Sequence, residues 1–205
     1  PEIAKEASHL TVLQRTAQFT FPAGNRPLTD DDLDDVRSNW DALIEKMRAH
    51  GGGFPAGPNP SRSALDDTPE EREALYESLW EQGSFQIFLK LYSDIAVNEE
   101  SNKTLSDFVR KKISEIVDDA ETARKLSPDH FVMTKRPILD AGYFETYNRD
   151  NVDLIDLRDD AIVRFTPTSV ITESGEHPID MLVLATGYDA ISGSMLRLNP
   201  KGRGG

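Results

Sequence analysis

Basic residues stand at two places in this chain where they could bind anions. Lys135 and Arg136 are adjacent and precede Pro137, and Arg15 ends the short run LTVLQR at residues 10–15. A lysine next to an arginine suits recognition of a phosphate together with a second anion, because lysine supplies a point charge and arginine a planar fork of donors. The alternative is a solvated surface charge at each place, and the residues alone leave both interpretations open.

Arg15 also bears on which nucleotide the chain would bind. The second strand of a dinucleotide-binding fold ends near the adenosine ribose, where an acid accepts from the 2′-hydroxyl of NAD and an arginine accommodates the 2′-phosphate of NADP. Here Arg15 is followed by Thr16, and no acid stands at that position. The sequence therefore favours NADP. The glycine-rich turn of such a fold would have to precede Pro1.

A third candidate is the stretch DMLVLATGYD at residues 180–189. Its apolar run predicts a strand over residues 181–186 that is buried on both faces, as in a parallel sheet. Gly187 follows, where a backbone can approach a ligand closely, and ligands of α/β sheets bind at the carboxyl ends of strands. We expect the strands at 10–15 and 181–186 to share one mainly parallel sheet.

A helical block at residues 29–127 is expected between these regions. Thr29 is a predicted N-cap, and apolar residues recur at helical spacing from Leu33 to Met47. Further helices are predicted from Pro69 to about Gln82, over 85–96, from Leu105 to Val117, and over 120–126. The aspartates within residues 30–35 could form a metal cluster, but they are more typical of a solvated helix start.

The pattern changes after Pro128. Short runs rich in β-branched residues predict strands at 152–156, 161–165 and 169–172, and a hairpin turn is predicted at 174–176. Residues 16–28 and 51–63 contain proline and glycine and are predicted to be irregular. The glycines at 51–53 lack the preceding strand and the lysine that a phosphate loop requires.

Composition excludes several classes of function. The formal net charge of −13 argues against nucleic acid as a partner, and a chain without cysteine cannot form disulfides or zinc–thiolate sites. No two of the four histidines are spaced to share a helix face, so we expect no metal site. No apolar run approaches the roughly 20 residues of a membrane span. A cytoplasmic protein without membrane partners is expected.

Three stretches carry a family resemblance. They are HLTVLQRTAQFTFPAGNRPL at 9–28, KRPILDAGYFETYNRDNVDLIDL at 135–157 and DMLVLATGYDAISGSMLR at 180–197. Together they closely resemble the Baeyer–Villiger flavin monooxygenases of the cyclohexanone and phenylacetone monooxygenase type. The alanine–threonine–glycine motif is the least specific part, because other flavin-containing monooxygenases share it.

The resemblance implies an enzyme that uses FAD, NADPH and O2 to insert one oxygen beside the carbonyl of a small ketone, giving an ester or lactone. It implies that Arg15, Thr16 and Lys135 hold the 2′-phosphate of NADP. It also implies that Arg136 is catalytic, contacts the cofactor and stabilises the negatively charged flavin peroxide and the anionic ketone adduct. Thr186 and Gly187 resemble a segment that passes close to the cofactors.

The implied fold is α/β and Rossmann-like: the NADP domain of a flavoprotein with two dinucleotide-binding domains, carrying a large helical insertion. We expect residues 1–28 to begin the NADP domain, 29–127 to be the insertion, 128–190 to return to the domain, and 191–205 to start a link to the FAD domain. The flavin-binding glycine turn is absent, so we interpret the chain as an inactive internal fragment whose partners are the remaining domains.

Two other functions stay open. The first is an N- or S-oxidising flavin monooxygenase, in which oxygen goes to a soft nucleophile and no such arginine is needed. The second is a non-catalytic acidic module that binds a partner protein through the helices predicted at 30–50 and 69–82.

Overall fold

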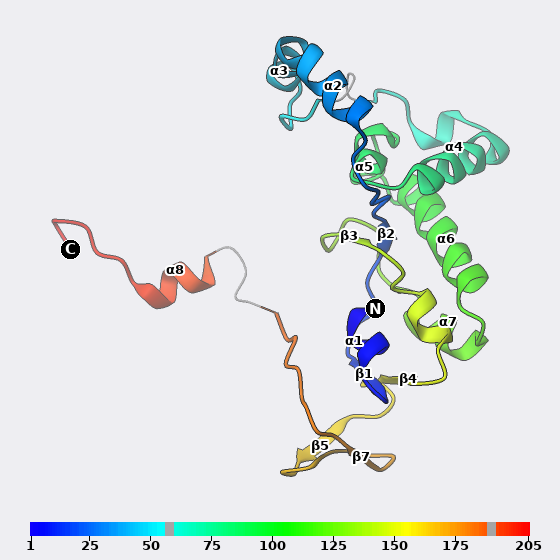
Figure 1. The fold of residues 1–205 in the computed structure, drawn as a ribbon, viewed down its shortest axis with the longest axis vertical. Coiled ribbons are helices and arrows are strands. Elements are labelled where there is room, and N and C mark those ends of the chain that lie inside the picture. The colour runs from blue at the N-terminus through cyan, green and yellow to red at the C-terminus, as the bar shows by residue number, and fades with distance from the viewer. Residues whose placement is uncertain (56–59, 188–191) are drawn as a thin grey trace. The chain divides into compact units, whose positions relative to one another are not determined.

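The computed structural model describes residues 1–55, 60–187 and 192–205. The chain divides into two compact units, Pro1–Asp159 and Asp160–Gly205 (Figure 1). The last two residues of the 180–189 stretch lie outside the described residues. The predicted α/β class is confirmed, with helices and both parallel and antiparallel strands present. No helix in the described ranges is long and apolar enough to cross a membrane.

A parallel strand pair forms one end of the first unit. Strand β1 (Leu10–Gln14) pairs with β4 (Val152–Asp156), with Leu10 opposite Val152 and Gln14 opposite Asp156. The short helix α1 (Glu2–Glu6) precedes β1, and the Asn151 side-chain amide donates to the Ala4 and Ala7 carbonyls. Both predicted strands are therefore confirmed, and everything between them is the crossover that a parallel pair requires.

A second parallel pair contradicts the prediction of an irregular connection at residues 16–28. Strand β2 (Thr20–Pro22) pairs with β3 (Ile138–Asp140). Three-residue strands are too short to show an alternating pattern, and Pro22 argues locally against a strand. Burial of aromatic rings explains the pairing, because Phe21 within β2 and Phe19 just before it are almost wholly buried.

The first helices of the predicted insertion carry an apolar stripe that stays exposed. Helices α2 (Asp30–Ser38) and α3 (Trp40–Ala49) meet at Asn39, and Thr29 forms a capping box with Asp32. No residue of either helix is buried. Asp32 also pairs with Arg26, so its carboxylate is engaged at the start of the helix. In the described ranges no acidic or histidine cluster could hold a metal ion.

Helix α4 (Pro69–Gln82) begins and ends where its sequence predicts. Thr68 and Glu71 form a capping box, and Gly83 ends the helix with φ of 60°. A Cβ at Gly83 would lie 2.8 Å from the Gly24 amide nitrogen, so only glycine fits there. The short helix η1 (Ala64–Asp66) precedes α4, and α5 (Gln86–Lys90) is shorter than the predicted 85–96 helix.

Helix α6 (Glu99–Ile116) is the centre of the first unit's core. One face contributes Leu105, Phe108, Val109 and Ile113, and the same cluster contains Phe19 and Phe21 beside β2. Full burial of one such side chain contributes roughly 1.5–3 kcal/mol. Helices α7 (Ala120–Leu126) and η2 (Glu145–Asn148) follow α6. The helical block and the strands thus share one core.

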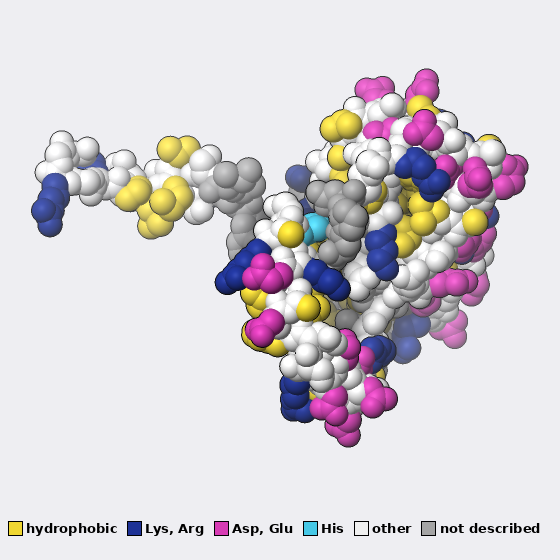
Figure 2. All heavy atoms as spheres, turned by 90° about the horizontal axis from the view of Figure 1, so that it is seen from above, with side chains coloured by type: hydrophobic (Ala, Val, Ile, Leu, Met, Phe, Trp, Pro, Cys, Tyr) yellow, Lys and Arg dark blue, Asp and Glu magenta, His cyan; other side chains and the backbone are white. Residues whose placement is uncertain are grey.

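The second unit contains a three-stranded antiparallel sheet in the order β5–β6–β7. Strands β5 (Ile162–Phe165) and β6 (Ser169–Thr172) confirm the predicted strands, and the predicted hairpin turn leads into β7 (Glu176–Pro178), a strand that the sequence did not predict. Helix α8 (Gly193–Leu198) presents exposed hydrophobic side chains, which are yellow in Figure 2.

The buried strand expected at residues 181–186 is the main error of the sequence prediction. These residues form no strand, and Met181, Val183 and Leu184 are exposed. The sheet neighbour of β1 is β4 instead. The physical reason is that an apolar run becomes a strand only where another strand takes its backbone hydrogen bonds, and nothing among the described residues does so for this run.

Candidate nucleotide-binding site

The candidate site begins at the carboxyl end of β1. Gln14, the last residue of the strand, is buried, and its side-chain amide donates to the Lys125 carbonyl of α7 at 2.8 Å. Arg15 and Thr16 follow and are exposed, while Ala17 is buried again. The strand end is therefore fixed on both sides of two exposed polar residues.

The structure brings this segment beside the one that contains Lys135 and Arg136. The Gln18 side-chain amide donates to the Arg136 carbonyl at 3.3 Å, and the Ile138 amide donates to the Phe19 carbonyl at 3.2 Å. One ring nitrogen of His130 lies 3.3 Å from the Ala17 carbonyl oxygen. Residues distant in sequence thus meet through the β2–β3 pairing that the sequence did not predict.

The three cations at this place have no partner of opposite charge. Arg15, Lys135 and Arg136 are exposed, and none forms an ion pair or a side-chain hydrogen bond with another residue of the described ranges. Most other cations of this acidic chain are paired, and acidic and basic side chains are interspersed on the face drawn in Figure 2. Unpaired cations in an acidic protein fit an anion such as a nucleotide phosphate.

Helix α6 holds the chain that leads to Lys135. Asn102, which is buried, donates from its amide nitrogen to the carbonyls of Ile95 and Val132, at 2.7 and 2.8 Å. Its amide oxygen accepts from the Val132 amide and the Ser106 hydroxyl. Arg110 donates to the Pro128 and His130 carbonyls. Sequence reasoning missed these residues, although polar side chains four positions apart on an apolar helix face were an available signal.

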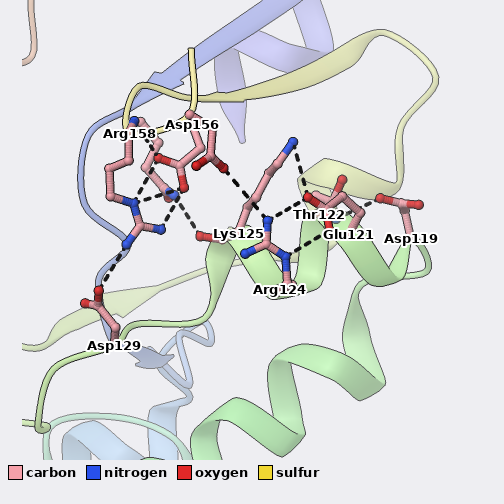
Figure 3. Close-up of polar contacts among 10 residues, drawn as sticks. Asp119, Glu121, Thr122, Arg124, Lys125, Asp129, Asp156 and Arg158 are labelled. Carbon is pink, nitrogen blue, oxygen red and sulfur yellow. Dashed lines mark hydrogen bonds and ion pairs between the residues drawn. The ribbon is translucent and has the colours of Figure 1, made fainter. Parts of the chain in front are cut away.

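An ion pair with a buried carboxylate and a partly exposed guanidinium lies at the carboxyl end of β4 (Figure 3). Asp156 is 2% exposed, and the Arg158 guanidinium donates to it from Nε and Nη2, at 3.0 and 2.7 Å. Arg158 Nη1 donates to Asp129 at 3.0 Å. The hydrogen bonds from Arg158 are the largest cause that lowers the pKa of Asp156 below its ordinary value. Sequence reasoning did not identify this pair either.

Thr186 and Gly187 belong to the second unit. Both are exposed, and Gly187 has φ of 89°, with no atom of the described residues beyond its chain neighbours within 4 Å of the point where a Cβ would lie. The first unit therefore contains four of the six predicted site residues, and the second unit contains the other two.

Relatives with known activities cover nearly the whole chain, although no family model matches it. A Baeyer–Villiger monooxygenase of Pseudooceanicola batsensis is 38% identical over 97% of this chain and 36% of that protein. A cyclohexanone 1,2-monooxygenase of Acinetobacter is 38% identical over 99% of this chain and 37% of its own length. A phenazine N-monooxygenase of Lysobacter antibioticus is 40% identical over 98% of this chain and 37% of its own length.

Solved structures agree with these relatives. An oxidized steroid monooxygenase bound to NADP superposes with a TM-score of 0.89 and 41% identity, covering 96% of this chain and 38% of that one. An open cyclohexanone monooxygenase gives a TM-score of 0.89 and 36% identity, and the match covers 95% of this chain and 38% of that one. The described residues therefore fold as the corresponding part of those enzymes does.

Fold and sequence together place the chain among the monooxygenases. Over nearly its whole length, its sequence and fold match the corresponding segment of Baeyer–Villiger monooxygenases. The chain spans little more than a third of the length of the relatives that it matches.

Proposed function

We propose that this chain supplies the NADP-binding part of an NADPH- and O2-dependent flavin monooxygenase that inserts one oxygen beside a ketone carbonyl. The observation that carries the proposal is that three exposed cations lack an acidic partner among the described residues: Arg15 at the carboxyl end of a parallel strand, and Lys135 and Arg136 on the segment that contacts Gln18. Relatives over nearly the whole chain, among them enzymes named for ketones, support the same activity.

In this proposal Arg15, Thr16 and Lys135 hold the 2′-phosphate of NADPH. The two cations supply charge, and the Thr16 hydroxyl supplies a neutral donor. The lack of a competing carboxylate partner on either cation, within the part of the chain that the structure describes, fits this assignment. The boundaries proposed for the NADP domain are 1–28 and 128–190, with the insertion at 29–127 and a link to the FAD domain from 191.

Arg136 is the proposed catalytic residue. Bound flavin would supply the activated oxygen, and NADPH would supply the electrons. Arg136 has a guanidinium fork without a partner in the described ranges, and this fork would stabilise negative charge that develops on the carbonyl oxygen during oxygen transfer. Its carbonyl accepts from Gln18, so the backbone below the side chain is fixed while the side chain is available to bind.

Thr186 and Gly187 are proposed to line the cofactor path. Gly187 has open space around it and a left-handed backbone, so the chain there can lie against a flat ring without a side chain in between. The ketone, O2 and the remaining domains of the complete enzyme are the proposed partners, and the cytoplasm is the proposed compartment.

The catalytic assignment is tested by Arg136→Ala in the complete enzyme. We expect ketone oxygenation to fall by at least about 10²-fold, as for removal of an oxyanion donor. NADPH oxidation should continue, with its reducing equivalents appearing as hydrogen peroxide. Arg136→Lys should retain little ketone oxygenation, because the point charge of lysine cannot reproduce the planar fork of the guanidinium group.

Arg37→Ala is the matched control for this experiment, since Arg37 is an exposed arginine of α2 that pairs with Asp34. It should leave oxygenation unchanged. Oxygenation rate and peroxide yield are measured on the same samples. If Arg136→Ala keeps the same coupling of NADPH to product, Arg136 has no catalytic role.

A second candidate function is oxygenation of nitrogen in a heteroaromatic substrate. The phenazine N-monooxygenase of Lysobacter antibioticus, at 40% identity, favours it. A nitrogen lone pair attacks the activated oxygen directly and leaves no carbonyl oxygen to stabilise. Turnover of a phenazine by the Arg136→Ala variant, together with lost ketone turnover, would favour this candidate for the natural reaction.

A further inference from the structure

A buried carboxylate lies close to the proposed phosphate-binding residues. Asp156 is opposite Gln14 in the β1–β4 pair, and the Leu157 amide donates to the Gln14 carbonyl at 2.8 Å. Arg15 is the next residue along the chain after β1. Neighbouring strands are roughly 4.8 Å apart, so the Asp156 backbone lies within about 10 Å of that of Arg15.

A free carboxylate at this position would oppose NADP binding. The 2′-phosphate carries negative charge, and a like charge on the neighbouring strand would repel it through a partly buried medium, where salt screens the repulsion only in part. The same charge would matter far less to NAD, whose ribose carries a neutral hydroxyl. The net charge of Asp156 and its surroundings should therefore influence which dinucleotide binds.

Arg158 neutralises this carboxylate in the structure. Figure 3 shows its guanidinium between Asp156 and Asp129, with both oxygens of Asp156 receiving hydrogen bonds from it. The contact with Asp156 is buried on the carboxylate side, whereas Asp129 is largely exposed. Three further charged residues lie near Asp156 and Arg158: Lys125, Arg124 and Asp159. Arg124 forms an ion pair with Glu121 at 2.7 Å.

We propose that Arg158 is a specificity-determining residue: by pairing with Asp156 it removes the charge that would otherwise exclude the 2′-phosphate of NADP from the site at Arg15. The inference rests on the proposed function. In this inference Arg158 does not contact the nucleotide and acts only by neutralising Asp156.

The experiment is a double-mutant cycle in the complete enzyme. The dissociation constants of NADP⁺ and NAD⁺ are measured by calorimetry for the wild type, Arg158→Gln, Asp156→Asn and the double variant. The ratio of the two constants is the readout, because loss of folded protein affects both nucleotides alike. Arg37→Gln, which removes the same charge from α2, is the control, and Arg15→Ala tests the phosphate site itself.

We expect Arg158→Gln to shift the ratio against NADP⁺ by about three- to tenfold, as for like charges at roughly 8–10 Å, with a smaller shift at high salt. The double variant should regain the wild-type ratio, and Asp156→Asn alone should shift it toward NADP⁺. Arg37→Gln should have no effect.

Three results would overturn the inference. One is an unchanged ratio in Arg158→Gln. Another is a double variant as impaired as Arg158→Gln, which would make Arg158 a direct phosphate ligand. The third is an unchanged ratio in Asp156→Asn. The asparagine amide removes the charge but can still form hydrogen bonds, so this variant tests the inference even if Arg158→Gln does not fold. An unchanged ratio in Arg15→Ala would instead contradict the proposed phosphate site.

Discussion

At the proposed site, neighbouring hydrogen bonds hold the backbone in place, whereas the charged side chains of Lys135 and Arg15 have no partner in the described ranges. Lys135 follows a segment that Asn102 and Arg110 of α6 hold in place, yet its ammonium group has no partner in the described ranges. Such an arrangement lowers the entropy lost on binding without occupying the binding group. The same holds for Arg15, which follows the anchored Gln14.

At this scale, Lys135→Met in the complete enzyme should weaken NADPH more than NADH, because only NADPH carries the 2′-phosphate. Loss of one charge-assisted contact should cost roughly 1.5–3 kcal/mol in NADPH affinity. Lys46→Met is the matched control, since Lys46 is an exposed lysine of α3 without a side-chain partner in the described ranges. Equal weakening of both cofactors would contradict the role given to Lys135.

The sequence was most informative where residue type alone carries the signal. Arg15 after a β-rich run and the pair Lys135–Arg136 could be proposed as anion ligands without coordinates, and the structure places their segments side by side. Asp156 and Arg158 could not be found in this way. Their meeting depends on the register of β1 against β4, and register is set by packing across the whole crossover.

Among the elements, helix ends were predicted better than short strands. Thr68 and Gly83 bound α4 because caps are local, involving backbone groups within one turn. Strands β2 and β3 were missed because each has only three residues, too few to show an alternating pattern, and is stabilised by its partner strand and by the buried rings of Phe19 and Phe21. Helix α5 ends at Lys90, earlier than its apolar pattern indicated. Leu91, Tyr92 and Ile95 are buried outside a helix, so their apolar character reflects burial and not helical structure.

An element-scale prediction concerns the end of α4. Gly83 has a left-handed backbone, and a Cβ there would lie 2.8 Å from the Gly24 nitrogen and 2.9 Å from the Pro22 carbonyl oxygen. Gly83→Ala should therefore destabilise the fold by more than about 1 kcal/mol, seen as a lower unfolding midpoint of the complete enzyme.

Gly175→Ala serves as the control for this substitution, because its added methyl group would have no described atom within 4 Å apart from those of its chain neighbours. It should leave the midpoint nearly unchanged. A Gly83→Ala variant as stable as the wild type would show that α4 and β2 shift apart at little energetic cost.

At the scale of the whole molecule, the apolar run at residues 181–187 has no hydrogen-bonding strand beside it in the described ranges. In the 205-residue chain its amides should exchange with deuterated solvent almost unprotected, since unpaired exposed backbone offers no barrier. In the complete enzyme we expect strong protection, because further strands would be present to pair with it. Hydrogen exchange read by mass spectrometry compares the two proteins.

Amides of β4 in the same samples provide the internal reference, since they are paired with β1 within the chain itself. They should be protected in both proteins. Strong protection of residues 181–187 in the isolated chain would mean that the run finds a partner there, and rapid exchange in the complete enzyme would mean that it is never a sheet strand.

The pairing of β1 with β4 also has a consequence for how the site comes into being during folding. Leu10 meets Val152 only after the entire helical block between them has closed the loop, so the contact is of the most non-local kind and should form late. Arg15 and Asp156 are neighbours only in that last state. A partly folded chain would then have no phosphate site, and a bound dinucleotide would stabilise the finished fold by mass action alone.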